Sequence, residues 1–238
     1  MTKLSKSRNR DVNALTNKVK NFIMSEGATL VGITSVRTLS KAPKGHRPTD
    51  FLPAAKSVIS IGLRMNKSSI LHLPKTTREY KEEYDVANLK LNTLAWETVR
   101  FLEGLRYQAL AIPASPPYDE KRNFGDMSHK HAAVASGLGK FGLNNLILTS
   151  NHGPYVRFVT VITDAELSTD EPLTEDICLR EKCSKCVKAC PVGALDNSRY
   201  DAFEGWRIDK KKCQEYLNVV SGGSVCGLCI KACPVGKR

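Results

Sequence analysis

The first 177 residues of this 238-residue chain contain no cysteine, and no apolar run in the chain is as long as a membrane helix. Such a helix needs about 20 consecutive apolar residues. The basic opening segment MTKLSKSRNR leads into no apolar segment of the kind that a secretory signal contains. We therefore expect a protein without membrane association, located in the cytoplasm, where the environment is reducing.

All eight cysteines are concentrated between residues 178 and 233. In a reducing compartment, such a concentration is more typical of metal ligands than of disulfides. The order is Cys178-x4-Cys183-x2-Cys186-x3-Cys190-Pro, then a single Cys213, then Cys226-x2-Cys229-x3-Cys233-Pro. The same Cys-x2-Cys-x3-Cys-Pro motif thus occurs twice.

A proline directly after the last cysteine of this motif is the pattern of bacterial two-cluster ferredoxins, in which that cysteine binds the other cluster. Zinc ribbons seldom place a proline there, so two structural zinc ions are the weaker alternative. We predict two 4Fe–4S clusters and a short helix in each motif. The predicted ligands of the first cluster are Cys178, Cys183, Cys186 and Cys233. Those of the second are Cys190, Cys213, Cys226 and Cys229.

Hydrophobic periodicity predicts an α+β fold for the whole chain. Helices are expected over residues 11–27, with Asp11 as N-cap, and 78–105, and a further helix carries SHKHAAVASGLG. Strands are expected over 29–36, 57–65 and 107–113, with two more in 144–163 joined by an Asn-His-Gly-Pro turn. We predict an α/β body over residues 1–170 and a ferredoxin-like domain over residues 171–238.

The chain carries a net charge of +12, and most of the excess lies in its front part. Residues 1–168 hold 24 basic and 14 acidic side chains, a net +10, whereas residues 169–238 add +2. An ordinary basic surface and an anionic partner or substrate are both compatible with this distribution.

Two stretches of the front part carry a family resemblance, HRPTDFLPAAKSVISIGL (46–63) and HKHAAVASGLGKFGLNNLILTSNHGPYVRFVTVITDAEL (129–167). With the cysteine order, they resemble the catalytic core of epoxyqueuosine reductases and reductive dehalogenases. The resemblance implies a nitroreductase-like body that holds a corrinoid with its lower base detached, and two clusters that pass electrons to cobalt. It covers the minimal core only, without the C-terminal helical repeats of the former or the export signal and substrate domain of the latter.

The resemblance also implies the residues that contact the corrinoid. Gly137, Gly139 and Gly142 would form a close backbone approach to it, and Asn144, Asn145, Tyr155 and Arg157 would lie along its rim. From the residues alone, a tight helix-to-strand turn explains the same glycines. The Asp-x-His-x-x-Gly motif of histidine-ligated corrinoids is absent, which fits a base-off cobalt and fits equally well with no corrinoid.

A reductive cleavage needs an acid within hydrogen-bond reach of the reacting group. Epoxyqueuosine reductases supply an aspartate upstream of the glycine turn, and the dehalogenases use a tyrosine. By this resemblance the candidates here are Asp126 and Tyr118. Asp126 is equally well placed to be the N-cap of the following helix.

Our leading hypothesis is a cytoplasmic oxidoreductase that takes electrons from an external donor of the ferredoxin or flavodoxin type. Epoxyqueuosine in tRNA is its leading substrate. The alternative is an electron-transfer protein that delivers low-potential electrons to a partner, for example a corrinoid protein, without a corrinoid of its own. A nucleic-acid-binding protein with structural clusters is the third reading. The substrate, the electron donor and the oligomeric state are left open by the sequence.

Overall fold

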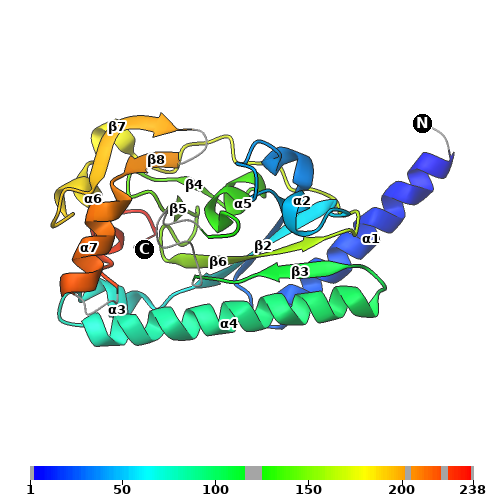
Figure 1. The fold of residues 1–238 in the computed structure, drawn as a ribbon, viewed down its shortest axis with the longest axis horizontal. Coiled ribbons are helices and arrows are strands. Elements are labelled where there is room, and N and C mark those ends of the chain that lie inside the picture. Colours follow the sequence, from blue (N-terminus) through cyan, green and yellow to red (C-terminus); the bar gives the residue numbers. More distant parts are fainter. Residues whose placement is uncertain (1–2, 116–124, 202–204, 221–224, 237–238) are drawn as a thin grey trace. The chain divides into compact units, whose positions relative to one another are not determined.

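The computed structural model describes residues 3–115, 125–201, 205–220 and 225–236, which form two compact units (Figure 1). Unit 1 contains residues 1–63, 89–138 and 158–172, and unit 2 contains residues 64–88, 139–157 and 173–238. The last change of unit, at residue 172, lies next to the predicted boundary at residue 170, but two earlier segments also belong with the cysteines. Among the described helices, none is both long and apolar enough to cross a membrane.

Unit 1 is built around a four-stranded sheet in the order β1-β2-β6-β3. Its strands are β1 (Leu30–Ser35), β2 (Ser57–Arg64), β3 (Ala109–Ile112) and β6 (Val156–Thr163). β1 pairs with β2 in antiparallel register, with Ile33 opposite Ile59, and β3 pairs with β6 in the same sense, with Ile112 opposite Thr160. All four strands occupy segments predicted as strands.

Helices cover both faces of this sheet (Figure 1). Because side chains alternate along a strand, Ile59 and Ile61 of β2 pack with α1 (Lys3–Ser25) and α4 (Thr77–Gly104). Val58, on the other face, packs in a second apolar cluster with α5 (His129–Ala135). The short elements η1 (Val36–Leu39) and α2 (Pro48–Phe51) complete that second layer.

The first helix is longer than predicted. It begins at Lys3, so Asp11 lies inside α1 and the prediction that it caps the helix is wrong. Residues 3–10 lack an apolar face, but their lysines and arginines have good helix propensity and extend the helix toward the N-terminus. Gly27, with φ of +98°, follows the end of the helix as predicted.

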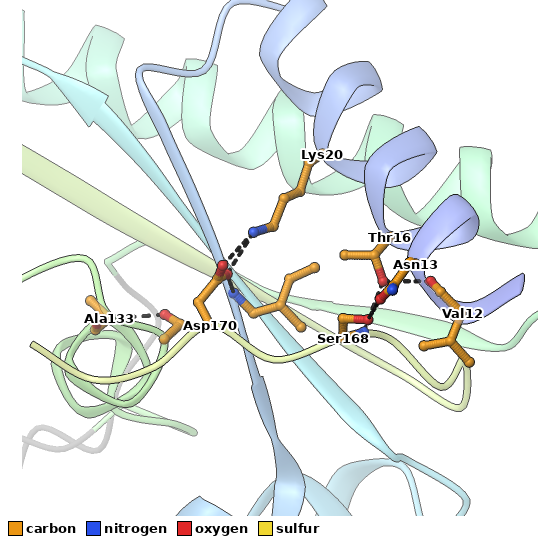
Figure 2. A network of polar contacts seen from close by, with 9 residues as sticks. Val12, Asn13, Thr16, Lys20, Ala133, Ser168 and Asp170 are labelled. Atoms are coloured by element: carbon orange, nitrogen blue, oxygen red, sulfur yellow. Dashed lines mark hydrogen bonds and ion pairs between the residues drawn. The ribbon is translucent and has the colours of Figure 1, made fainter. Parts of the chain in front are cut away.

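Polar contacts hold residues 168–170, which follow β6, against α1 and β1 (Figure 2). The ammonium group of Lys20 lies 2.6 Å from Asp170 Oδ1, and the backbone N–H of Ile33 donates to Asp170 Oδ2 at 2.8 Å. One turn earlier in α1, Thr16 Oγ1 accepts the backbone N–H of Ser168 at 2.8 Å. The acidic segment that leads toward the cysteines is therefore fixed to unit 1 at its start.

Unit 2 contains the cysteines and several short elements. They are α3 (Lys67–Leu71), β4 (Lys140–Phe141), β5 (Ile147–Leu148), η2 (Arg180–Lys182), α6 (Lys185–Lys188), β7 (Leu195–Asp201), β8 (Gly205–Ile208), α7 (Lys210–Val220) and α8 (Leu228–Ala232). Its apolar core joins Ile70, Leu73, Tyr80, Tyr155 and Ile230. Both strands predicted in residues 144–163 exist, but they join different sheets, because β5 pairs with β4 and β6 pairs in unit 1.

Candidate metal centre

Two short helices organise the cysteine motifs. Cys186 lies in α6 and Cys229 lies in α8, and the two helices contact each other. Cys190 and Cys233 follow these helices, each directly before a proline. The predicted short helix in each motif is therefore confirmed.

One cavity of unit 2 collects four cysteines from both motifs. Cys178, Cys183, Cys186 and Cys233 all line it. The rest of the lining is apolar except for one amide, and consists of Leu143, Asn144, Leu148, Leu179, Pro234 and Val235. These are the same four cysteines that the ferredoxin pattern groups around the first cluster.

The other four cysteines influence one another electrostatically. Burial raises the pKa of the Cys213 thiol, and the nearby Cys190 and Cys226 raise it further. Burial also raises the pKa of Cys229 to about 12, with Cys226 and Cys213 as its strongest negative neighbours. Cys186 of the first group also raises the pKa of Cys229, so the two groups lie next to each other.

The chemistry of these donors fits iron–sulfur clusters. All eight cysteines are free thiols. Burial, followed by repulsion from Cys233 and Cys178, raises the pKa of Cys186 to about 11. Four thiolates around one apolar cavity therefore need a cationic centre, which cluster iron supplies. Among the described residues, no three cysteine, histidine or acidic side chains are grouped to hold a single metal ion.

A glycine contact fixes the segment that carries Cys233, and sequence reasoning missed it. Gly153, in the Asn-His-Gly-Pro turn, has φ of +54°, and a Cβ there would lie 2.2 Å from the carbonyl oxygen of Val235. A Cβ on Gly236 would lie 2.4 Å from the carbonyl carbon of His152. Only glycines allow the two backbones to approach this closely, and the contact positions the chain directly after Cys233.

The three glycines of the predicted corrinoid turn make close contacts with the chain itself. A Cβ on Gly137 or on Gly139 would lie 2.4 Å from a backbone carbonyl oxygen. A Cβ on Gly142 would lie 2.8 Å from the side-chain oxygen of Asn144. The absence of a side chain at each position is therefore explained by intramolecular packing, as in the structural alternative.

Three of the residues predicted for the corrinoid rim are buried in unit 2. They are Asn144, Asn145 and Tyr155, which are 4%, 4% and 0% exposed. The Tyr155 hydroxyl has no hydrogen-bond partner among the described residues, and burial together with the nearby Cys233 raises its pKa. Asn144 lines the cysteine cavity, and Asn145 adopts a left-handed backbone with φ of +56°.

Arg157, the fourth rim residue, contacts two other side chains of unit 2. Its Nε donates to Asn88 Oδ1 at 2.7 Å, and its guanidinium lies 3.8 Å from the centre of the Tyr84 ring. This stacking is favourable because the ring face carries negative charge density.

The two candidate proton donors differ in how far they can be placed. Tyr118 lies outside the described residues. Asp126 is exposed in a bend before α5, in unit 1 with Gly137, and its carbonyl oxygen accepts from His46 Nδ1 at 2.9 Å. The alternative role of Asp126 as N-cap is wrong, because Ser128 caps α5 and its hydroxyl accepts the N–H of His131.

Residues 178–237 match the protein family described as 4Fe-4S dicluster domain. This match confirms the predicted two-cluster, ferredoxin-like region at the end of an α+β chain. The class of protein that this match and the cysteines indicate is an iron–sulfur protein with a 4Fe-4S dicluster domain.

Proteins of similar sequence and fold allow a more specific comparison. The chain is 27% identical over 186 residues to epoxyqueuosine reductase of Bacillus subtilis, covering 74% of this chain and 42% of the relative. Its fold matches a reductive dehalogenase whose structure suggests a mechanism for B12-dependent dehalogenation (TM-score 0.74, 20% identity, 92% of this chain, 31% of the other). It also matches an epoxyqueuosine reductase with an epoxyqueuosine-modified tRNA stem loop (TM-score 0.65, 21% identity, 94% and 66%).

The chain spans less than half the length of the Bacillus subtilis relative. In sequence and fold it is nevertheless similar to the superfamily that contains epoxyqueuosine reductases and reductive dehalogenases, in line with the resemblance seen in the sequence.

Proposed function

We propose that this chain is an oxidoreductase in which Cys178, Cys183, Cys186 and Cys233 hold one 4Fe–4S cluster. Cys190, Cys213, Cys226 and Cys229 would hold the second. The observation that carries the proposal is the single cavity lined by three cysteines of the first motif and the last cysteine of the second. When bound, the two clusters supply one-electron transfer over a short distance.

The chain's own residues would shield the first cluster and hold its ligands. The apolar side chains of Leu143, Leu148 and Leu179 line the cavity beside the cysteines, and the buried Leu143 and Leu148 would limit the access of water to it. At the proposed second cluster, the backbone N–H of Ala194 donates to the ligand Cys190 Sγ at 3.2 Å. Burial and N–H···S hydrogen bonds are two of the features that set a cluster's reduction potential.

The proposal includes a base-off corrinoid, whose cobalt would supply the reducing centre for the substrate. It is supported by the B12-dependent dehalogenation named for one structural relative and by the buried Tyr155 hydroxyl, which fits a polar ligand. Tyr155, Asn145 and Arg157 would contact the corrinoid with their side chains. The glycines of the turn, which pack against the chain, would contribute backbone atoms.

For proton delivery we propose Asp126, or Tyr118 in the segment before it. Asp126 is exposed, and its carboxylate is not used to cap α5. A carboxyl group that reaches the substrate would donate a proton as electrons arrive. Asp126→Asn should abolish turnover while the iron content stays unchanged, and full activity of this variant would refute the role.

For the substrate we propose a nucleotide-borne group, with epoxyqueuosine in tRNA as the leading candidate. A structural relative binds an epoxyqueuosine-modified tRNA stem loop, and the net charge of +12 suits a polyanionic partner. The electron donor would be a ferredoxin or flavodoxin. A cytoplasmic location is part of the same proposal.

The second candidate function is electron delivery to a partner protein, without a bound corrinoid. The observation that favours it is the packing of the chain itself against Gly137, Gly139 and Gly142. In this case the glycine turn is structural and the clusters are the only redox centres.

Metal analysis separates these functions. Protein purified without oxygen, reconstituted with iron and sulfide and then given cobalamin should retain about eight irons per chain, four for each cluster. Cobalt near one per chain supports the corrinoid-dependent reductase, whereas eight irons without cobalt support the electron carrier. Zinc in place of iron would refute both.

A further inference from the structure

Among the described residues that line the cysteine cavity, Asn144 is the one that brings a side-chain amide to it. It is 4% exposed, and all other lining residues are cysteines or have apolar side chains. A buried amide in an apolar cavity is costly unless both its acceptor and its donor are used. The partners of its two polar atoms therefore indicate its role.

The oxygen of this amide has a partner within the chain. Asn144 Oδ1 accepts the backbone N–H of Leu146 at 3.2 Å, an interaction that fixes which end of the amide is oxygen. Gly142 leaves space for this arrangement, because a Cβ there would lie 2.8 Å from the same oxygen. The orientation of the amide is therefore set by the chain.

The nitrogen of the Asn144 amide has no such partner among the described residues. Asn144 Nδ2 is buried and has no hydrogen-bond partner among the residues that the structure describes. If the side chain at position 144 were needed only to accept the N–H of Leu146, aspartate or serine would serve equally well, because both also form such local turns. Asparagine adds a donor at the cavity, and leaving that donor unpaired would cost about 1–3 kcal/mol.

We propose that Asn144 Nδ2 donates a hydrogen bond to a sulfur of the first cluster, either a sulfide or a ligand thiolate, and raises the reduction potential of that cluster. An N–H···S bond stabilises the more negative, reduced state more than the oxidised state. Asn144 is then a residue that tunes the cluster, a role different from the corrinoid contact that the resemblance implied. The inference rests on the proposed first cluster but not on the substrate or the corrinoid.

Asn144→Asp tests the proposal with little change of shape. Aspartate keeps the oxygen that accepts from Leu146 and replaces the donor NH2 by a second oxygen. In a redox titration followed by electron paramagnetic resonance, the equilibrium constant for reducing the first cluster should fall about tenfold, which is about 59 mV for one electron. The first cluster's signal is identified by its absence in Cys186→Ser, and the second cluster should keep its potential.

The matched control is Asn218→Asp. Asn218 is exposed on α7 of the same unit, and its Oδ1 accepts from Gln214 Nε2 at 2.9 Å, so the substitution again keeps an acceptor and removes a donor. This variant should leave both potentials unchanged. A shift of the same size in the control would show that added charge alone explains the result and would overturn the proposal.

A second measurement needs no variant and decides the question if Asn144→Asp fails to assemble its cluster. Wild-type protein is produced with 15N in the asparagine side chains, and the reduced first cluster is examined by pulsed electron paramagnetic resonance. The proposal requires a nitrogen coupling from an asparagine side chain, and its absence would overturn it. A wild-type protein without iron would instead refute the proposed function.

Discussion

The proposal that the last cysteine of each motif binds the cluster of the other motif can be tested by replacing cysteines in pairs. Cys186 and Cys233 belong to different motifs but line the same cavity, and they are 8% and 7% exposed. Cys226 shares a motif with Cys233 but groups with the other set. The structure therefore separates ligand sharing from sequence proximity.

The expected iron contents follow from this grouping. A serine hydroxyl is a poorer ligand for cluster iron than a thiolate, so each single variant should lose one cluster, from about eight irons to about four. Cys186→Ser combined with Cys233→Ser damages one cluster twice and should keep about four irons. Cys226→Ser combined with Cys233→Ser damages both clusters and should keep almost none.

The assay is the iron and sulfide content of anaerobically reconstituted protein, with the number of reducible clusters counted by electron paramagnetic resonance. Cys213→Ser combined with Cys226→Ser is the control, because both belong to the proposed second group and about four irons should remain. The reasoning is refuted if Cys186→Ser with Cys233→Ser loses all iron while Cys226→Ser with Cys233→Ser keeps half. That result would mean that each motif holds its own cluster.

Two further predictions concern packing. Gly153→Ala should lower the melting temperature more than Gly193→Ala. Both glycines have positive φ, +54° and +58°, which costs alanine about 1–2 kcal/mol at either position. Of the two, only Gly153 has a described atom within 4 Å of the position that a Cβ would take. Equal losses would contradict the proposed backbone contact. Asp170→Ala removes the partner of Lys20 and of a β1 backbone N–H and should cost about 1–3 kcal/mol of unfolding free energy, against at most about 0.5 kcal/mol for Glu103→Gln in an exposed ion pair. Urea unfolding measures the stability of Asp170→Ala and of Glu103→Gln, and similar losses would show that the half-buried Lys20–Asp170 network adds no stability.

The longer elements were predictable because their patterns are local. The run SVISIG of β2 is buried at every position, which its continuous apolar and small residues indicate. The apolar face of α4, with Leu91, Leu94 and Leu102 fully or almost fully buried, also follows from helical spacing. In contrast, the two-residue strands β4 and β5 are too short to show a period. The division of β5 and β6 between sheets depends on distant partners.

At the candidate site, too, some features could be predicted from the local sequence and others could not. Cysteine spacing and the proline after each motif predict that Cys178 and Cys233 share a cluster, and both residues line one cavity although they are 55 positions apart in the sequence. The glycines were harder to interpret, because only the folded chain shows which atoms occupy the space beside them. The hydrogen bond that fixes the Asn144 amide has no sequence signature beyond a polar residue near a glycine.

The composition of the cavity also constrains when it is completed during synthesis. A chain still emerging from the ribosome presents Cys178, Cys183 and Cys186 well before Cys233 has been added, so it offers three thiols and an open side. The turn at Gly153 is made earlier still and waits for residues 235 and 236 to pack against it. Cys233 and residues 235 and 236 therefore complete the cavity after its other parts have been made, and a chain that stops before Cys233 would present three thiols without the fourth.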